Sequence, residues 1–159
     1  MSPIRDPIHG YIEISPYIEK LLDTRIVQCL RNVKQLGWMN LVYPGANHTR
    51  FEHSLGTYYL ASRLGSELSE DERREIEIAA LLHDIGHGPY SHDSEDIIEE
   101  YTRRRHDDVL FLLENPEIAS ILDEYGIKPS AISSHIQGKT KIGQIITGSL
   151  DVDRMDYLI

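Results

Sequence analysis

Near the middle of the chain, residues 76–82 form an almost continuous apolar run in which Glu77 is the only strongly polar side chain. A helix of this composition is apolar nearly all round, and such helices lie at the centre of a fold. His83 and Asp84 follow the run directly, so we expect both side chains to be desolvated. A buried imidazole beside a buried carboxylate needs compensation, which either a mutual hydrogen bond or a divalent cation supplies.

Capping and periodicity signals predict helices along most of the remaining chain. Ser69, with Glu72 three residues later, forms a capping box that begins the central helix. Other helices are predicted from Pro16, from Thr24 to about Lys34, from Thr49 to about Leu68, over residues 92–101, 105–114, 116–125, 129–136 and 140–148, and from residue 151. Before them, Pro7, Gly10 and the alternation at residues 11–14 predict a turn and a short strand. The sequence therefore predicts an all-α fold with a short N-terminal β segment.

The 159 residues suit a single domain spanning 1–159, with enough bulk for a hydrophobic core. Sixteen basic and 26 acidic residues give a net charge of −10, which disfavours nucleic acid and anionic membranes as partners. A local basic pocket can still bind a small anion. Cys29 is the single cysteine, which excludes an internal disulfide framework, and we expect it to be a small buried side chain. Neither a signal segment nor a membrane-spanning window is apparent, so a cytoplasmic location is expected.

His87 follows His83 by one helical turn and shares its face if the helix continues that far. Two imidazoles and the Asp84 carboxylate would then form a ligand set suited to manganese, iron, nickel, cobalt or zinc. His53 and one of Asp151 and Asp153 are further candidate ligands in separate segments. Ligands so far apart in the sequence can meet only through the fold, because no local loop connects them.

Six motifs occur along the chain in the following order: Asp6-Pro7-Ile8-His9-Gly10, Lys34-Gln35-Leu36-Gly37, Tyr43-Pro44-Gly45-Ala46, Thr49-Arg50-Phe51-Glu52-His53-Ser54-Leu55-Gly56, His83-Asp84-Ile85-Gly86-His87-Gly88-Pro89-Tyr90-Ser91-His92 and Asp151-Val152-Asp153-Arg154-Met155-Asp156-Tyr157. Together they resemble the HD-domain metal-dependent phosphohydrolases, in the branch that contains the SAM-and-HD-domain deoxynucleoside triphosphate triphosphohydrolase and its prokaryotic relatives. The resemblance covers almost the whole chain. Members of that branch continue well past the last motif, so we expect this chain to lack their C-terminal region.

The resemblance implies an HD-domain helical bundle, and it also implies a role for individual site residues. One divalent ion (Mn, Fe, Ni, Co, Zn or Mg) would be bound by His53, His83, Asp84 and Asp153. Catalytic roles fall to His87, His92, His106 and Arg50. Substrate contacts fall to Gln35, Leu36, Arg50, Arg154 in place of a lysine, and Tyr157. Gln35 and Leu36 match a pair that holds the sugar and leaves no room for a 2′-hydroxyl.

A guanine nucleotide effector and a homo-oligomer are also implied by the resemblance. Asp23, Gln28 and Arg31 match the residues that hold such an effector at a subunit interface. The alternative is a solvated helix face on which Asp23 is a helix cap.

Several of these residues have plainer interpretations. His92 could cap the following helix, and His106 could lie on a solvated face beside the arginine run at 103–105, which is itself typical of surface charge. His9, His48 and His135 are predicted to be structural or exposed.

The predicted function is hydrolysis of a nucleotide substrate, most directly a deoxynucleoside triphosphate, to deoxynucleoside and triphosphate. A 5′-nucleotidase or phosphodiesterase on the same metal is an alternative. A nucleotide-binding regulatory module without turnover is another.

Overall fold

The structure is a computed structural model that describes residues 3–158. Its helices are α1 (Pro16–Leu22), α2 (Arg25–Cys29), α3 (Arg50–Leu64), α4 (Glu70–Leu82), α5 (Glu95–Thr102), α6 (Leu110–Leu113), α7 (Pro116–Glu124), α8 (Pro129–Ile136) and α9 (Val152–Tyr157). Short 3-10 turns are η1 (Leu30–Asn32), η2 (Gly37–Leu41), η3 (Gly65–Glu67), η4 (Ser91–Ser94) and η5 (Ile142–Ile145). Strands β1 (Ile4–Asp6) and β2 (Gly10–Ile12) pair antiparallel, with Arg5 opposite Tyr11. The predicted all-α fold with a short N-terminal β segment is confirmed.

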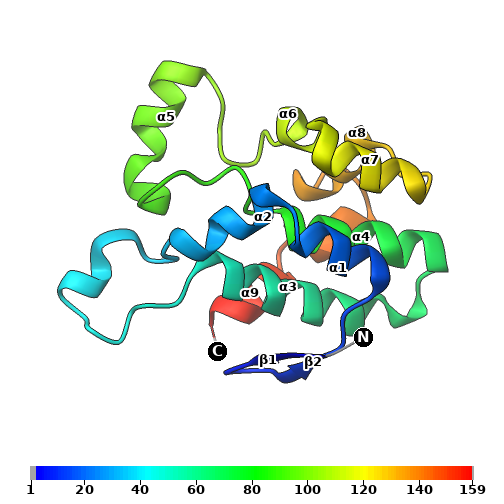
Figure 1. The fold of residues 1–159 in the computed structure, drawn as a ribbon, viewed down its shortest axis with the longest axis horizontal. Coiled ribbons are helices and arrows are strands. Elements are labelled where there is room, and N and C mark those ends of the chain that lie inside the picture. Colours follow the sequence, from blue (N-terminus) through cyan, green and yellow to red (C-terminus); the bar gives the residue numbers. More distant parts are fainter. Residues whose placement is uncertain (1–2, 159) are drawn as a thin grey trace.

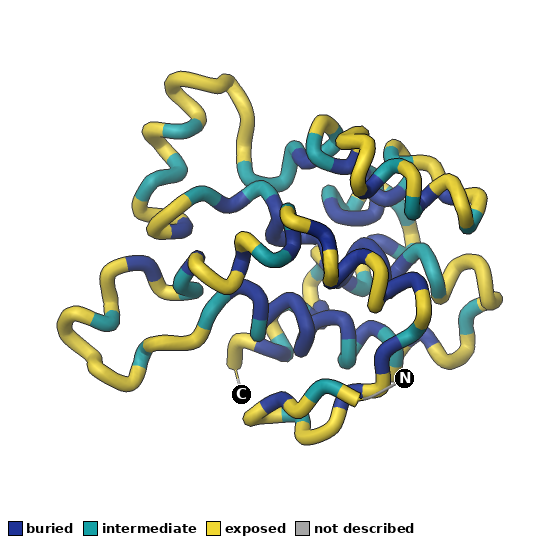
Figure 2. Tube along the Cα trace, in the orientation of Figure 1, coloured by how far each residue is buried: buried dark blue, intermediate teal, exposed yellow. Residues whose placement is uncertain are grey.

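Helix α4 occupies the centre, between α3 and α8 (Figure 1). Its apolar residues, including Ile76, Ile78, Leu81 and Leu82, are fully buried, and the centre of the molecule is correspondingly dark in Figure 2. Glu77, the polar exception, is also buried and accepts a hydrogen bond from the Tyr17 hydroxyl of α1 at 2.5 Å. The central position predicted from the apolar run is therefore observed.

The N-terminal hairpin lies against α3 at the bottom of Figure 1, beside the end of the chain at α9. Asp6 shapes its turn, because one carboxylate oxygen accepts from the backbone N–H groups of Ile8 and His9, each at 2.8 Å. The predicted strand at residues 11–14 is in part correct, since β2 ends at Ile12. This turn places His9 close to α9.

Three predicted helices are shorter than expected, and the one predicted over 140–148 forms only the 3-10 turn η5. The one predicted from Thr24 to Lys34 ends at Cys29 and continues only as the 3-10 turn η1, because Lys34 pairs with Thr49 in an isolated β-bridge. The one predicted from Thr49 to Leu68 ends at Leu64 and continues only as the 3-10 turn η3. Of the predicted 105–114 helix, only Leu110–Leu113 is helical.

One side chain predicted to be buried is exposed. Cys29 lies at the surface, because Val27 and Leu30 take the buried positions of that segment.

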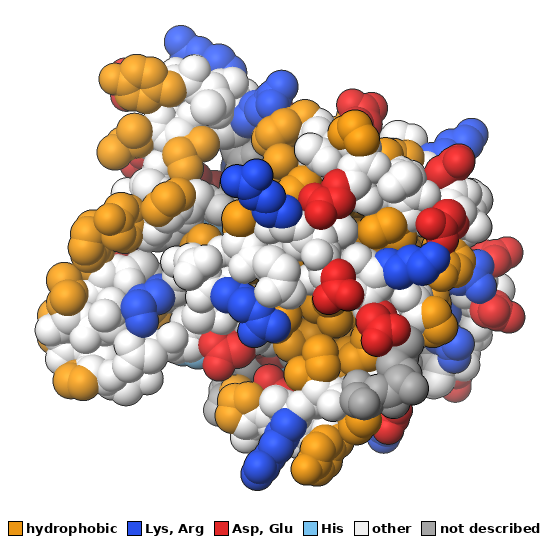
Figure 3. Space-filling model, in the orientation of Figure 1, with side chains coloured by type: hydrophobic (Ala, Val, Ile, Leu, Met, Phe, Trp, Pro, Cys, Tyr) orange, Lys and Arg blue, Asp and Glu red, His pale blue; other side chains and the backbone are white. Residues whose placement is uncertain are grey.

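The segment around η2 forms a lobe with exposed apolar side chains, seen on the left of Figure 3. Trp38 of this lobe stacks on Tyr90 with ring centroids 4.0 Å apart. Among residues 3–158, no helix combines the length and apolar character needed to cross a membrane.

Candidate metal centre and active-site cavity

Four candidate ligands from three segments converge at one point. His53 Nε2 lies 3.3 Å from His83 Nε2 and 3.0 Å from a carboxylate oxygen of Asp153. Asp84 approaches from the other side, with oxygens 3.4 Å from His83 Nε2 and 3.8 Å from His53 Nε2. His53, His83 and Asp84 are buried, whereas Asp153 is half-buried. The structure thus brings together the four residues that the resemblance implied.

Helix ends position these side chains. Thr49 and Glu52 form a capping box in which the Thr49 N–H donates to the Glu52 carboxylate at 2.6 Å, and this fixes the first turn of α3 that carries His53. His83 is the C-cap residue of α4, where the buried run ends and the chain turns. Asp84 follows it directly, so both side chains leave the core together.

The two aspartates of the last motif have different positions. Asp151 is the N-cap of α9 and accepts from the Arg154 N–H at 2.9 Å and the Gly148 N–H at 2.8 Å. Asp153, in the first turn of α9, contacts His53 instead. Asp153 is therefore the candidate ligand, and Asp151 shapes the helix that carries it.

Each ligand histidine has its other ring nitrogen occupied. His83 Nδ1 donates to the Ala80 carbonyl at 2.8 Å, and His53 Nδ1 donates to a carboxylate oxygen of Asp156 at 2.7 Å. Since these acceptors require a proton on Nδ1, the Nε2 lone pairs of both rings are left for a cation.

The charges of the site suit a divalent ion. Burial opposes ionisation of Asp84, yet the fields of His83 and Arg50 hold its pKa well below the usual range. Burial alone would lower the pKa of His53, but hydrogen bonds to Asp153 and Asp156 raise it to about 9. When no metal is bound, the Asp153 and Asp156 carboxylates therefore favour a protonated His53 ring. A divalent cation fits the same set of nitrogen and oxygen donors.

Arg50 lies beside this cluster and is only 2% exposed. Its Nη1 donates to Asp84 at 2.5 Å and its Nε donates to the Ser91 hydroxyl at 2.9 Å. Ser91 in turn donates to the Lys34 carbonyl at 2.6 Å. Arg50 Nη2 is buried without a hydrogen-bond partner in the described part of the chain. A buried guanidinium with an unused donor suits an anionic oxygen.

A cavity of about 290 Å³ opens above the cluster. Its lining combines metal-ligand candidates, histidines and polar side chains, namely Gln35, Arg50, His83, Asp84, His87, His92, Arg105, His106, Asp107, Ile136, Gln137, Thr147, Asp153 and Tyr157. Arg105, Asp107, Gln137 and Thr147 were not among the predicted site residues. Their segments carry no motif, and only the fold brings them to the cavity.

Three histidines form one wall of this cavity. His87 stacks on His106 with ring centroids 4.4 Å apart, and His92 lies edge-on to His87 at 4.8 Å. Glu95 pairs with both outer rings: it is 2.9 Å from His92 Nδ1 and forms a short contact with His106 Nδ1. Burial opposes ionisation of Glu95, but these two hydrogen bonds lower its pKa to about 2. The carboxylate therefore holds both outer imidazoles in place.

His87 reaches the site by a turn and not on a continued helix. Helix α4 ends at Leu82, and the His87 N–H donates to the Asp84 carbonyl at 3.1 Å. Gly86 makes this turn possible, because a Cβ there would lie 2.1 Å from the His106 carbonyl oxygen. Burial, the largest influence, lowers the pKa of His87 to about 3 against the opposing field of Asp84.

Two predicted substrate contacts lie outside the cavity lining. Leu36 is 48% exposed, next to Gln35, which does line it. Arg154 is exposed, with its Nε 3.9 Å from Asp151.

In the arginine run at 103–105, the Arg104 guanidinium lies over the Phe111 ring, 4.0 Å from its centroid.

Of the predicted effector residues, Asp23 and Arg31 are exposed and Gln28 is half-buried. Gln28 Nε2 donates to the Leu22 carbonyl at 2.7 Å, and Arg31 Nε donates to Gln28 Oε1 at 2.8 Å. Asp23 is exposed and is the C-cap residue of α1, whereas the N-cap of α2 is Thr24. Asp23 is therefore a cap residue at the end of α1, and Thr24 provides the side-chain cap of α2.

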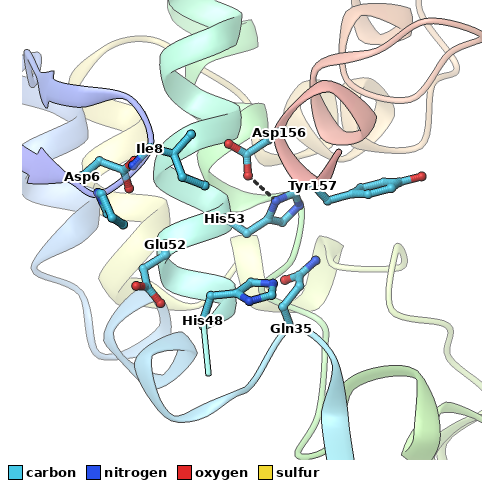
Figure 4. Close-up of a pocket in the computed structure, with 9 residues that line it drawn as sticks. Asp6, Ile8, Gln35, His48, Glu52, His53, Asp156 and Tyr157 are labelled. Atoms are coloured by element: carbon cyan, nitrogen blue, oxygen red, sulfur yellow. Dashed lines mark hydrogen bonds and ion pairs between the residues drawn. The ribbon is translucent and has the colours of Figure 1, made fainter. Parts of the chain in front are cut away.

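A second cavity of about 280 Å³ has His53 in its wall (Figure 4). Asp156 also lines it, and Gln35 and Tyr157 line both cavities. The Gln35 Oε1 atom is buried without a partner in the described residues.

Fold and site together define a class: helical domains in which histidine and aspartate side chains from separate helices converge as ligands for a divalent metal. The chain belongs to the HD-domain family, because the family model described as "HD domain" matches residues 50–159. The predicted class is thereby confirmed, and membership supports binding of a divalent metal.

Individual relatives cover the chain more fully. An uncharacterized protein, MJ1154 of Methanocaldococcus jannaschii, is 41% identical over 100% of this chain and 33% of its own length. The deoxynucleoside triphosphate triphosphohydrolase SAMHD1 homolog of Dictyostelium discoideum is 36% identical over 98% of this chain and 35% of its own length. The crystal structure of a hypothetical protein from Aquifex aeolicus superposes with a TM-score of 0.88 at 35% identity, covering 99% of this chain and 44% of that one. The chain thus spans about a third of the length of these two curated relatives.

Proposed function

We propose that this protein is a metal-dependent phosphohydrolase that converts a deoxynucleoside triphosphate to deoxynucleoside and triphosphate. The observation that carries the proposal is the convergence of His53, His83, Asp84 and Asp153. The last three of these residues line a cavity together with Arg50, His87, His92 and His106. The relatives named as deoxynucleoside triphosphate triphosphohydrolases support the choice of substrate.

A divalent ion held by these ligands would polarise a phosphoryl oxygen and lower the pKa of a bound water. Arg50 supplies a buried positive charge, and its unused Nη2 donor would bind a phosphate oxygen and stabilise charge that grows there during the reaction. Asp84 fixes the position of the guanidinium through Nη1.

The leaving 5′-oxygen of a nucleoside needs a proton, and the histidine wall supplies it in this proposal. His87 is buried with a pKa of about 3, so it is neutral near pH 7 and serves as a hydrogen-bonding group. His92 and His106 each pair with Glu95, which fixes the orientation of both rings in the cavity. One of these two is the proton donor in this proposal.

Gln35, Leu36 and Tyr157 would bind the deoxyribose, and Arg154 would contact the phosphates. Asp23, Gln28 and Arg31 would bind a guanine nucleotide effector, with a homo-oligomer as the active form. The exposed hydrogen bond between Gln28 and Arg31 is compatible with a second ligand there. If GTP changes neither the oligomer mass nor the thermal stability, the effector site is wrong.

The test is product analysis with a panel of nucleotides and each candidate divalent metal, in this chain and in any longer natural chain that contains it. In oxygen-18 water, attack at the α-phosphorus puts label in triphosphate and none in the deoxynucleoside. Free labelled monophosphate with dGDP or dGMP would instead identify a different phosphohydrolase. Asp84→Ala should abolish both metal binding and turnover. No product from any nucleotide would favour a binding module.

A further inference from the structure

A carboxylate lies directly behind the candidate ligand His53. One oxygen of Asp156 accepts from His53 Nδ1 at 2.7 Å, and the two side chains are only 2% and 8% exposed. Figure 4 shows Asp156 beside His53, with its carboxylate joined to the ring by a dashed line. An ionised carboxylate can only accept, so this contact places the His53 proton on Nδ1.

The second oxygen of Asp156 is also occupied. His9 Nε2 donates to it at 2.7 Å, and the His9 side chain is 7% exposed. His9 is held in turn by the β1–β2 turn, where its backbone N–H donates to Asp6, and by packing against Tyr59 with ring centroids 4.9 Å apart. A continuous series of contacts therefore runs from the hairpin to the metal centre.

Gly56 makes room for this arrangement on the surface of α3. A Cβ at that position would lie 1.8 Å from the Asp156 carboxylate and 2.9 Å from His9 Nε2. The backbone of α3 is thus shaped to receive both side chains, one turn along from His53.

The two candidate ligand histidines are supported differently. His83 donates to a neutral backbone carbonyl, that of Ala80, whereas His53 donates to the Asp156 carboxylate. A carboxylate partner makes the opposite ring nitrogen a stronger donor to a metal and also fixes the ring orientation. His53 is consequently the ligand whose strength depends on residues outside the cluster.

We propose that Asp156 and His9 are positioning residues of the metal centre, with Asp156 orienting His53 and His9 holding Asp156 in place. The N-terminal hairpin is then a functional part of the site, although it contributes no ligand. This inference rests on the proposed role of His53 as a ligand.

The experiment measures binding of Co²⁺ alone, because its visible absorption reports the geometry of its ligands as well as the dissociation constant. Asp156→Asn preserves shape and removes the charge, and we expect it to weaken Co²⁺ binding about 10- to 100-fold and alter the spectrum. Asp123→Asn, an exposed site on α7, is the matched control and should leave both unchanged. Thermal unfolding in chelator establishes that each variant is folded.

A second pair of variants tests His9. His9→Ala removes the donor and should weaken Co²⁺ binding about tenfold, by the same effect of an outer partner. His9→Gln can still donate to Asp156 through its amide and should recover most of that affinity. Tyr11→Ala, exposed on the same hairpin, should match the wild type. If Asp156→Asn does not fold, the comparison of His9→Ala with His9→Gln still tests the positioning role.

The outcomes separate the two proposals. A wild-type chain that binds no Co²⁺ overturns the metal centre itself, and this inference with it. A wild-type chain that binds Co²⁺, together with folded Asp156→Asn and His9→Ala variants of unchanged affinity and spectrum, overturns the positioning role alone.

Discussion

Arg50 combines three tasks in one buried side chain. Its guanidinium pairs with Asp84, and its Nε donates to the Ser91 hydroxyl, which fixes its orientation. Its Nη2 has no hydrogen-bond partner among the described residues. A lysine retains the charge, but its single ammonium group cannot place three donor nitrogens in one fixed plane as the guanidinium does. Arg50→Lys should therefore bind metal and lose roughly a hundredfold in kcat, as expected for loss of one preorganised donor. Steady-state hydrolysis at equal metal content is the measurement.

Arg63→Lys is the matched control, because Arg63 is exposed at the far end of the same helix. Its turnover should equal that of the wild type. If turnover by Arg50→Lys is within threefold of the wild type, the proposed role of Arg50 in stabilising the phosphate charge is wrong.

His87 makes stability depend on pH in a defined direction. Its pKa is about 3 in the folded protein against 6.5 for an ordinary histidine, so the unfolded chain takes up this proton first as pH falls. Folding should therefore lose stability between about pH 6.5 and pH 3, by up to about 1.4 kcal/mol per pH unit. Urea unfolding of metal-free protein at several pH values measures this slope.

His87→Gln should flatten the slope over that window, because the glutamine cannot titrate. The remaining slope below about pH 4.5 should come from carboxyls such as Glu95, whose pKa is lowered to about 2. Equal slopes in wild type and variant would show that His87 is not buried as a neutral ring.

Residue types left Asp151 and Asp153 open as ligands, and the family resemblance carried by the motifs implied the four candidate ligands and the cavity histidines. They did not identify Asp156 and His9 as partners of His53, and His9 was predicted to be structural or exposed. The two residues are separated by 147 positions in the sequence, and only the docking of the hairpin beside α9 brings them together. No periodicity or spacing rule carries that information.

Helices α3 and α4 both begin with a capping box, but the two boxes lie at different distances from the metal centre. Thr49 caps α3 at the end that carries Arg50 and His53, whereas Ser69 caps α4 at the end opposite His83. Thr49→Ala and Ser69→Ala should each cost about 1 kcal/mol of unfolding free energy. Only Thr49→Ala should also weaken metal binding, since it releases the turn that holds the ligand.

Chemical denaturation and Co²⁺ titration of both variants make the comparison. If the two lose equal stability and equal metal affinity, the effect is global and the local argument is wrong. If neither loses stability, the capping boxes contribute nothing measurable.

Element type was predictable where local and tertiary preferences agree. The central helix has an apolar run and a capping box, and both point to α4 as observed. Prediction was wrong where a tertiary contact decides the conformation. Residues 105–109 are not helical, and the close packing of the His106 backbone against Gly86 fixes this stretch instead.

The whole molecule is organised around links between distant parts of the chain. The proposed ligands belong to α3, the end of α4 and α9, and the His9–Asp156 contact ties the hairpin to the same point. Helix α9 packs chiefly on α3 and has few other neighbours among the described elements. Its stability should therefore depend on the metal more than that of any other helix.

Hydrogen exchange with and without metal tests this dependence across the molecule. At a metal concentration 100-fold above the dissociation constant, global stability should rise by about 2.7 kcal/mol. For a domain of this size that corresponds to roughly 5–10 °C in Tm. Amides of α9 should gain protection at metal concentrations that leave α7, remote from the site, little changed, because α9 opens locally when the Asp153 link is absent. Asp153→Asn should remove the selective gain, whereas equal gains in α7 and α9 of the wild type would mean that the metal stabilises the fold without tethering its last helix.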